Sequence, residues 1–414
     1  MTSTNTVRAA SPAAAAKAAP VLRRNGAFAR IDIFDDIAAV EGIWRRLERE
    51  GALATPYQSF DLMSSWYRHV GTREAVQPRI VAGFDAAGRP ACLLPFGRSR
   101  LGPLGIIGFL GGKHANFNFG LWRRDLVAAL SASDVQDIFR RIAAAGGGDV
   151  CNLLRQPRSW EGIGNPLALL PHQPSPSGSM RLELSRPGDA LVKSALSSAM
   201  RGRLRTKERR LRQLDGYRYF RATSAAEVDR LLDVFFPLKA AHMAAMGLSN
   251  IFAEPGQENF LRECCHHGIA DGKPLIELHA LETANELLAV FAGITDRRRF
   301  SGMFNTYTRS DNARQSPGLI LLTHIVANLA DRGFRSFDLG VGEAHYKTFF
   351  CKEPEPLFDS FLPLTPLGRL AAIATREGSR LKRQVKQSQA LWSLVQLMRR
   401  SFRGAAPAKS GGES

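Results

Sequence analysis

The most informative segment of the sequence is Arg309-Ser-Asp-Asn-Ala-Arg-Gln-Ser-Pro-Gly-Leu-Ile320, in which a polar loop gives way to an apolar run. Ser316 is a favoured N-cap residue, and Pro317 suits the first position of a helix. Gly318 has no side chain, so another group can approach the backbone closely there. We therefore expect a helix that begins at Pro317 and runs to about Asp331.

The start of this helix also has the properties of an anion-binding site. The N–H groups of the first turn lack intrahelical acceptors, and the helix dipole places partial positive charge beside them. Arg309 and Arg314 add charge, and together these features suit a pyrophosphate. A well-capped helix without a ligand explains the same residues, and this segment alone does not choose between the two interpretations.

Strand-like runs surround the helix on both sides along the chain. Three of them, at residues 275–281, 287–294 and 300–306, are joined by short turns, which indicates an antiparallel meander. A further strand is expected at residues 334–339, directly after the helix. Upstream of the meander, the sequence predicts one long basic helix over residues 188–214.

A second polar segment follows the last of these strands and reads Phe337-Asp-Leu-Gly-Val-Gly-Glu-Ala-His-Tyr-Lys-Thr-Phe349. Its polar side chains are Asp338, Glu343, His345, Tyr346 and Lys347. Acyl transfer to an amine needs a base for the acceptor proton and an acid for the leaving thiolate. A carboxylate and a tyrosine near a strand end could supply both, although a loop of paired charges, such as Glu343 with Lys347, is the alternative.

Read together, the two segments resemble the GNAT acetyl-CoA fold. The turn Gln315-Ser-Pro-Gly318 matches the family's [Gln/Arg]-x-x-Gly pattern, although Ile320 stands where the family usually has a small residue. The wider pattern adds the basic stretch Leu204-Arg-Thr-Lys-Glu-Arg-Arg-Leu-Arg-Gln-Leu-Asp-Gly216 and Phe337-Asp-Leu-Gly-x-Gly-Glu-x-x-Tyr-Lys347. It resembles the CelD-like acetyltransferases, a GNAT branch linked to exopolysaccharide and cellulose biosynthesis in bacteria, over about residues 30–400.

This resemblance implies an α/β (α+β) fold of two tandem GNAT-like domains, as in the Fem peptidyltransferases. Each domain would have a mixed central sheet flanked by helices, and a basic C-terminal helix would follow. Only the second domain would keep an acyl-CoA site. The implied boundaries are a disordered tail at 1–27, an N-terminal domain at 28–178, a C-terminal domain at 179–362, a basic helical tail at 363–403 and a disordered end at 404–414.

The resemblance also implies roles for individual residues, with an acyl-CoA such as acetyl-CoA as co-substrate. The residues expected to bind the cofactor are Arg309, Arg314, Gln315, Ser316, Gly318 and Leu319. Strand 300–306 would offer backbone N–H groups to the thioester carbonyl. Glu343 would act as base and Tyr346 as acid, with Asp338 as a further catalytic residue. Lys347, His345 and Tyr307 would contact an acceptor, which could be anionic or sugar-linked.

The block Gly111-Gly-Lys-His-Ala-Asn-Phe-Asn-Phe119 in the first half also resembles this branch, where a similar block could face the acceptor.

The net charge of +18 requires an anionic partner or a solvated basic surface. The basic run at 201–212 is interpreted as a solvated helix face or the wall of an acceptor channel. Aromatic interleaving is absent from this run, so no specific nucleic acid partner is expected. The basic tail could lie on an anionic membrane through its basic face and Trp392, or pack on the body of the protein.

Several classes of protein are excluded by missing patterns. The sequence has no apolar run long enough to span a membrane, no secretory signal, no Gly-x-Ser-x-Gly elbow and no Walker motif. The cluster Cys264-Cys265-His266-His267 lacks metal-ligand spacing, so no metal is expected. A cytoplasmic location, at most peripheral to the inner membrane face, is the resulting expectation.

Two alternatives to an acyl-CoA-dependent acyltransferase remain open at this point. One is a Fem-like transferase that uses aminoacyl-tRNA, which the double-domain plan and basic surface permit. The other is a catalytically inactive GNAT-like scaffold of a polysaccharide synthesis complex.

Overall fold

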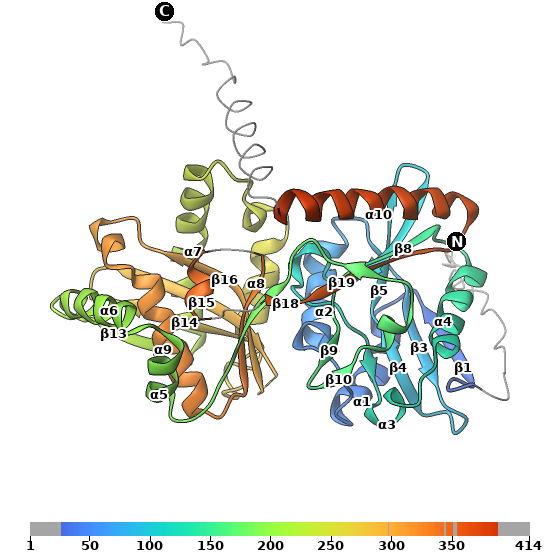
Figure 1. The fold of residues 1–414 in the computed structure, drawn as a ribbon, viewed down its shortest axis with the longest axis horizontal. Helices are drawn as coiled ribbons and strands as arrows, with labels where there is room; N and C mark the ends of the chain where they lie inside the picture. The colour runs from blue at the N-terminus through green and yellow to red at the C-terminus, as the bar shows by residue number, and fades with distance from the viewer. Residues whose placement is uncertain (1–25, 297, 343–344, 351–353, 388–414) are drawn as a thin grey trace, which may run out of the picture.

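The computed structural model describes residues 26–296, 298–342, 345–350 and 354–387 (Figure 1). The chain forms two halves, each with mixed β-structure flanked by helices, so the expected α+β tandem fold is confirmed. Most of the expected tail at 1–27, and all of 404–414, lie outside the described residues.

The first half contains two main sheets. The antiparallel four-stranded sheet has the order β1-β3-β4-β7, and the six-stranded sheet has the order β11-β19-β8-β6-β5-β2. The strands of the first are β1 (Arg30–Phe34), β3 (Ile80–Phe84), β4 (Pro90–Leu94) and β7 (Leu121–Trp122). Those of the second are β2 (Gln77–Pro78), β5 (Phe96–Leu101), β6 (Leu104–Phe109), β8 (Val150–Pro157), β11 (Gln173–Pro174) and β19 (Leu357–Pro363).

Helices cover these sheets because each has an apolar face to bury. Trp44 and Leu47 of α1 and Trp66 of α2 are buried in the core that the sheets share. The helices of this half are α1 (Glu41–Arg49), α2 (Phe60–Trp66), α3 (Arg124–Val127) and α4 (Ala132–Ala145). The short pair β9 (Ser159–Trp160) and β10 (Ile163–Gly164) forms a separate hairpin.

The second half is built on one seven-stranded sheet with the order β13-β14-β15-β16-β17-β12-β18. The expected meander is present as β14, β15 and β16. Among the described strands of the whole sheet, the only parallel pair is β16 with β17. The strands are β12 (Ser179–Glu183), β13 (Arg218–Arg221), β14 (Ile276–Glu282), β15 (Leu287–Thr295), β16 (Arg299–Tyr307), β17 (Ser336–Val341) and β18 (Pro354–Glu355).

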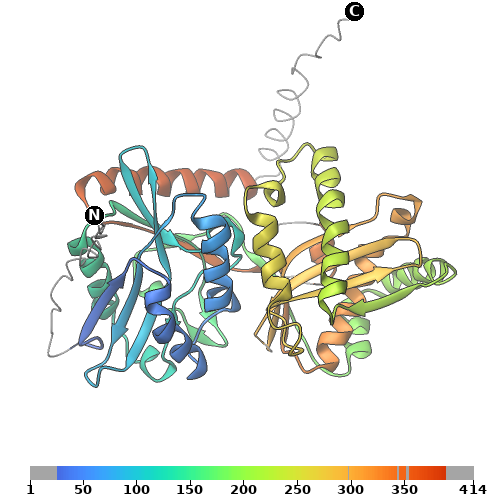
Figure 2. The same cartoon turned by 180° about the vertical axis from the view of Figure 1, so that it is seen from behind.

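Helices pack on both faces of this sheet (Figures 1 and 2). One face carries α5 (Gly188–Ala195), α6 (Ser198–Leu211) and α9 (Pro317–Asp331), and the other carries α7 (Ala225–Ala245) and α8 (Gln257–His266). The prediction of one helix over 188–214 is wrong. Leu196 has an extended backbone, and Ser197 accepts a hydrogen bond from the Met200 N–H to begin a new helix.

The chain returns to the first half after the second sheet. Strand β19 inserts between β11 and β8, and α10 (Pro366–Gln387) packs on β19 and β8. The chain therefore changes sheet between β18 and β19, a few residues before the domain boundary expected at residue 362. The expected basic C-terminal helix is present over the described part of 363–403. Within the described ranges, no helix combines the length and apolarity needed to cross a membrane.

Candidate functional site

The site begins where two neighbouring strands of the second sheet diverge. Strands β16 and β17 pair only between Arg299–Ser301 and Ser336–Asp338. Beyond that point β16 continues to Tyr307 without β17 beside it. The divergence leaves the end of β16 without a strand partner on one edge, where backbone groups can bind a ligand instead of a strand.

A pocket of about 290 Å³ lies at this opening. Its walls come from β15 and the end of β16, from the first turns of α9 and from Tyr346. The β16 residues in the wall are Asn305, Thr306 and Tyr307. The pocket therefore joins the exposed strand edge to the N-terminus of a helix, which binds anions through its free N–H groups.

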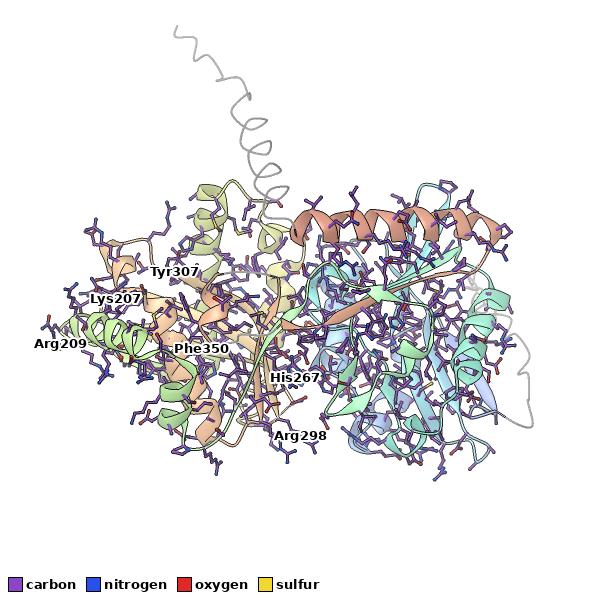
Figure 3. The ribbon with its side chains drawn as sticks, viewed as in Figure 1. Lys207, Arg209, His267, Arg298, Tyr307 and Phe350 are labelled. Carbon is purple, nitrogen blue, oxygen red and sulfur yellow. The ribbon has the colours of Figure 1, made fainter. Side chains whose placement is uncertain are left out.

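The turn into α9 has an unusual backbone. Ser316 adopts the left-handed conformation with φ 55°, and its side chain does not cap the helix. Its hydroxyl oxygen instead lies 2.7 Å from Nζ of Lys207, which donates to it from α6. Lys207 and Tyr307 lie on the same side of the second half (Figure 3). The expected helix start at Pro317 is confirmed, and Lys207 places an ammonium group beside it.

Asn116 of the first half reaches the opening. The Asn116 Nδ2 group donates to the carbonyl oxygen of Gly302 on β16 at 2.8 Å and to the Tyr57 hydroxyl at 2.9 Å. Its Oδ1 atom accepts from the N–H of Val341 on β17 at 3.3 Å. Asn116 thus bridges both strands just beyond the point where their pairing stops.

Comparison with known proteins agrees with this geometry. Residues 198–348 match the acetyltransferase (GNAT) domain family, in its CelD-like branch. This part of the chain is a GNAT acetyltransferase domain. No curated protein sequence matches the chain.

Solved structures share the tandem fold at low sequence identity. The structure of FemX is 9% identical, with a TM-score of 0.56 over 81% of this chain and 98% of FemX. A conserved protein of unknown function from Bacteroides thetaiotaomicron is 12% identical, with a TM-score of 0.50 over 80% of this chain and 99% of that protein. At these identities the likeness concerns the fold alone.

Tyr346, the residue predicted to act as the acid, lines the pocket of the GNAT domain. Its hydroxyl accepts a hydrogen bond from Nδ2 of Asn305 at 3.2 Å. Burial raises the pKa of Tyr346 above its ordinary value, and the Asn305 hydrogen bond opposes this only in part. The phenol therefore carries its proton at neutral pH and can donate it.

The two arginines predicted to bind the donor are not in the pocket wall. The Arg309 guanidinium donates to the Ala241 carbonyl oxygen at 3.4 Å, and Arg314 forms an exposed ion pair with Asp311 at 3.3 Å. From sequence, Lys207 belonged to a basic run interpreted as a solvated helix face or the wall of an acceptor channel, and the basic stretch in the family pattern was the available signal.

The remaining predicted donor-binding residues belong to the turn itself. Ser316, Gly318 and Leu319 line the pocket. The Oε1 atom of Gln315 is buried without a hydrogen-bond partner among the described residues. A bound ligand with a hydrogen-bond donor could satisfy it.

Asp338 and Lys347 lie outside the pocket wall and hold the end of β17. Asp338 is fully buried, accepts from Nε of Arg299 at 2.8 Å and also accepts from the Ser301 hydroxyl. Nζ of Lys347 donates to the carbonyl oxygens of Gly340 at 2.9 Å and Gly342 at 3.0 Å. In these contacts both side chains hold the end of β17, and their predicted catalytic and acceptor-binding roles stay predictions.

Two predicted residues cannot be placed. Glu343 lies outside the described residues, and of His345 only the backbone is described, at the start of the 3-10 helix His345–Phe349. Tyr307 does line the pocket mouth and is about half exposed.

Among the described residues, no group of three or more His, Cys, Asp and Glu side chains is arranged to hold a metal ion. Cys264 and Cys265 are buried on α8, and burial raises the pKa of both thiols. They are therefore protonated core residues.

Proposed function

We propose that the chain moves an acetyl or longer acyl group from CoA to an amine or hydroxyl acceptor by direct attack. The GNAT domain makes the protein an acyltransferase by family. The observation that supports acyl-CoA as donor is the pocket that joins the free edge of β16 to the N-terminus of α9. A long donor with a pyrophosphate at one end of its arm and a thioester at the other suits such a pocket.

In this proposal the pyrophosphate lies at the turn formed by Gln315 to Leu319. The N-terminus of α9 supplies partial positive charge, and Lys207 supplies a full charge beside Ser316. Arg309 and Arg314 would swing toward the same phosphates. The pantetheine arm would run along β16 in the place of a neighbouring strand. The backbone N–H groups of β16 would donate hydrogen bonds to it.

The chemical step needs no covalent enzyme intermediate. The lone pair of the acceptor nitrogen or oxygen attacks the thioester carbonyl, whose developing negative charge is stabilised by a backbone N–H of β16. The carbon–sulfur bond then breaks, and the thiolate takes the proton of Tyr346. Glu343 is proposed to remove the acceptor proton, directly or through water.

The pocket walls bear on the choice of acyl group. Val290, Phe291, Leu321 and Leu322 make one side of the pocket apolar. An apolar wall favours a hydrocarbon chain over a charged acyl group because it offers that charge no hydrogen bonds. The acceptor is proposed to belong to exopolysaccharide, cellulose or envelope biosynthesis, and that link is supported by the CelD-like branch alone.

Calorimetric titration of the purified protein tests the proposal. Acetyl-CoA, a longer acyl-CoA and adenosine 3′,5′-bisphosphate would be titrated separately, with the adenosine compound as a control for the nucleotide end. Micromolar binding of an acyl-CoA supports the transferase. Binding of aminoacyl-tRNA without any acyl-CoA binding would favour the Fem-like alternative, and no binding of either would favour an inactive scaffold.

A further inference from the structure

An unusual feature of α10 is that its larger apolar side chains point away from the protein. A surface helix normally buries its leucines and exposes its polar residues. In α10 the side facing the first half contains small residues: Ala372 is buried, and a side chain at Gly368 would collide with the Asp149 carbonyl. The outward residues are instead Leu367, Leu370, Ile373 and Leu381, which are 48%, 69%, 56% and 61% exposed.

Two other elements reach the same edge of the molecule as α10. In both Figure 1 and Figure 2 the tip of the β5–β6 hairpin and the connection between α7 and α8 extend to the upper edge, beside or beyond α10. Leu101 at the hairpin tip is 69% exposed. In the α7–α8 connection Met246 is 59% exposed, and Leu248 and Ile251 are also exposed.

The exposed apolar residues are therefore concentrated rather than scattered. Isolated exposed leucines are ordinary, but a row of them over three separate elements marks an interaction surface. Leu154, Leu169 and Leu214 are examples of exposed leucines outside these elements, and they do not form such a row. We name the surface formed by α10, the β5–β6 tip and the α7–α8 connection the apolar edge.

Basic side chains flank the apolar edge. On α10, Arg369, Arg380 and Lys382 are exposed, and Arg100 is exposed beside Leu101 at the hairpin tip. Glu377 is the acidic residue of described α10, and Arg380 pairs with it at 2.7 Å. Exposed leucines between arginines and lysines are the combination by which a helix lies in the headgroup region of an anionic bilayer.

We propose that the apolar edge docks on the surface of an anionic membrane. The apolar side chains would enter the boundary between headgroups and acyl chains, and the arginines and lysine would contact lipid phosphates. The 22 residues of α10 give about 33 Å of helix along the surface. The protein would lie on the bilayer without crossing it, and the proposal is independent of the proposed acyl transfer.

Cosedimentation with vesicles tests this proposal on the full chain. Vesicles of equal parts phosphatidylglycerol and phosphatidylethanolamine are compared with vesicles of phosphatidylcholine. The wild type is expected to sediment with the anionic vesicles, less with the zwitterionic ones, and less at high salt. The double variant Leu370→Glu/Leu381→Glu is expected to lose at least tenfold in partitioning, because it places two negative charges in the apolar row.

The matched control is Leu214→Glu/Val234→Glu, which makes the same change of charge at exposed apolar positions away from the apolar edge. It is expected to partition like the wild type. Leu101→Glu, on a different element, repeats the test if the α10 variant does not fold by circular dichroism. Equal loss in the control, or no sedimentation of the wild type, would overturn the proposal. A wild-type dimer in sedimentation velocity that the α10 variant dissociates would assign the apolar edge to a second copy instead.

Discussion

At the scale of single residues, the turn at Ser316 has one feature that the sequence predicts and one that only the structure reveals. The sequence places a helix start at Pro317 correctly because Ser and Pro have strong positional preferences there. It does not reveal that Lys207 holds the Ser316 hydroxyl, because the two are 109 residues apart. A contact between residues far apart in the chain produces no recognisable pattern in the local sequence.

Lys207→Met is expected to weaken acetyl-CoA binding at least tenfold, since a charge-assisted hydrogen bond contributes about 1.5–3 kcal/mol. The loss should shrink as salt is raised, because salt screens the same charge in the wild type. Titrations at low and high salt measure both effects. Arg203→Met, an exposed position on the same helix, is the control, and an equal loss there would point to general surface charge.

Tyr346→Phe is expected to slow acyl transfer about 100-fold, within the range for a general acid, and to leave acetyl-CoA affinity unchanged. The phenol hydroxyl is the only atom removed, and Asn305 keeps its place in the wall. Thiol release from acetyl-CoA with a panel of amine and amino-sugar acceptors gives the rate. Unchanged turnover would remove Tyr346 from the mechanism.

At the scale of elements, the opening between β16 and β17 depends on contacts from several segments. Asn116 bridges the two strands, Lys347 binds the carbonyl oxygens at the end of β17, and Asp338 is tied to Arg299. The Arg299 guanidinium also stacks on the rings of Trp160 and Phe117 from the first half. The meander and α9 were predictable from periodicity and capping, whereas these cross-half contacts were not.

Asn116→Ala is expected to accelerate amide hydrogen exchange at Val341 and to weaken acyl-CoA binding, because the bridge between the strands is lost. Asn118→Ala is the matched control. Asn118 lies two residues away and donates to the Leu154 carbonyl oxygen at 2.8 Å within the first half. Both variants lose partly buried hydrogen bonds, each of which contributes about 1 kcal/mol, so thermal unfolding should shift in both. Faster exchange at Val341 in the control as well would contradict the assigned role.

At the scale of the whole molecule, the two halves are not consecutive along the chain. Strand β19 follows the second sheet in sequence but lies between β8 and β11 of the first half. The sequence shows a boundary near residue 362 because composition changes there toward a basic helix. It does not show which sheet a strand joins, since that depends on pairing with residues some 200 positions earlier.

A chain ending at Pro356 is expected not to form a stable first half. It lacks β19 and α10. The core of the first half therefore loses the buried side chains of Phe358 and Phe361, and β8 loses a neighbouring strand. A chain ending at Gln387 keeps every described element and is the control. Circular dichroism and thermal unfolding compare them, and a cooperative transition like that of the control in the shorter chain would contradict this account of the fold.

The most direct test of the account is acetyl-CoA binding by two variants at Gly318. A side chain there would meet Tyr307 only at 3.8 Å and the glycine needs no left-handed backbone, so both variants should fold. Gly318→Ala is expected to bind as the wild type does. Gly318→Trp is expected not to bind, because the indole fills the pocket at the start of α9. Binding by Gly318→Trp at wild-type affinity would place the donor elsewhere and contradict the central claim.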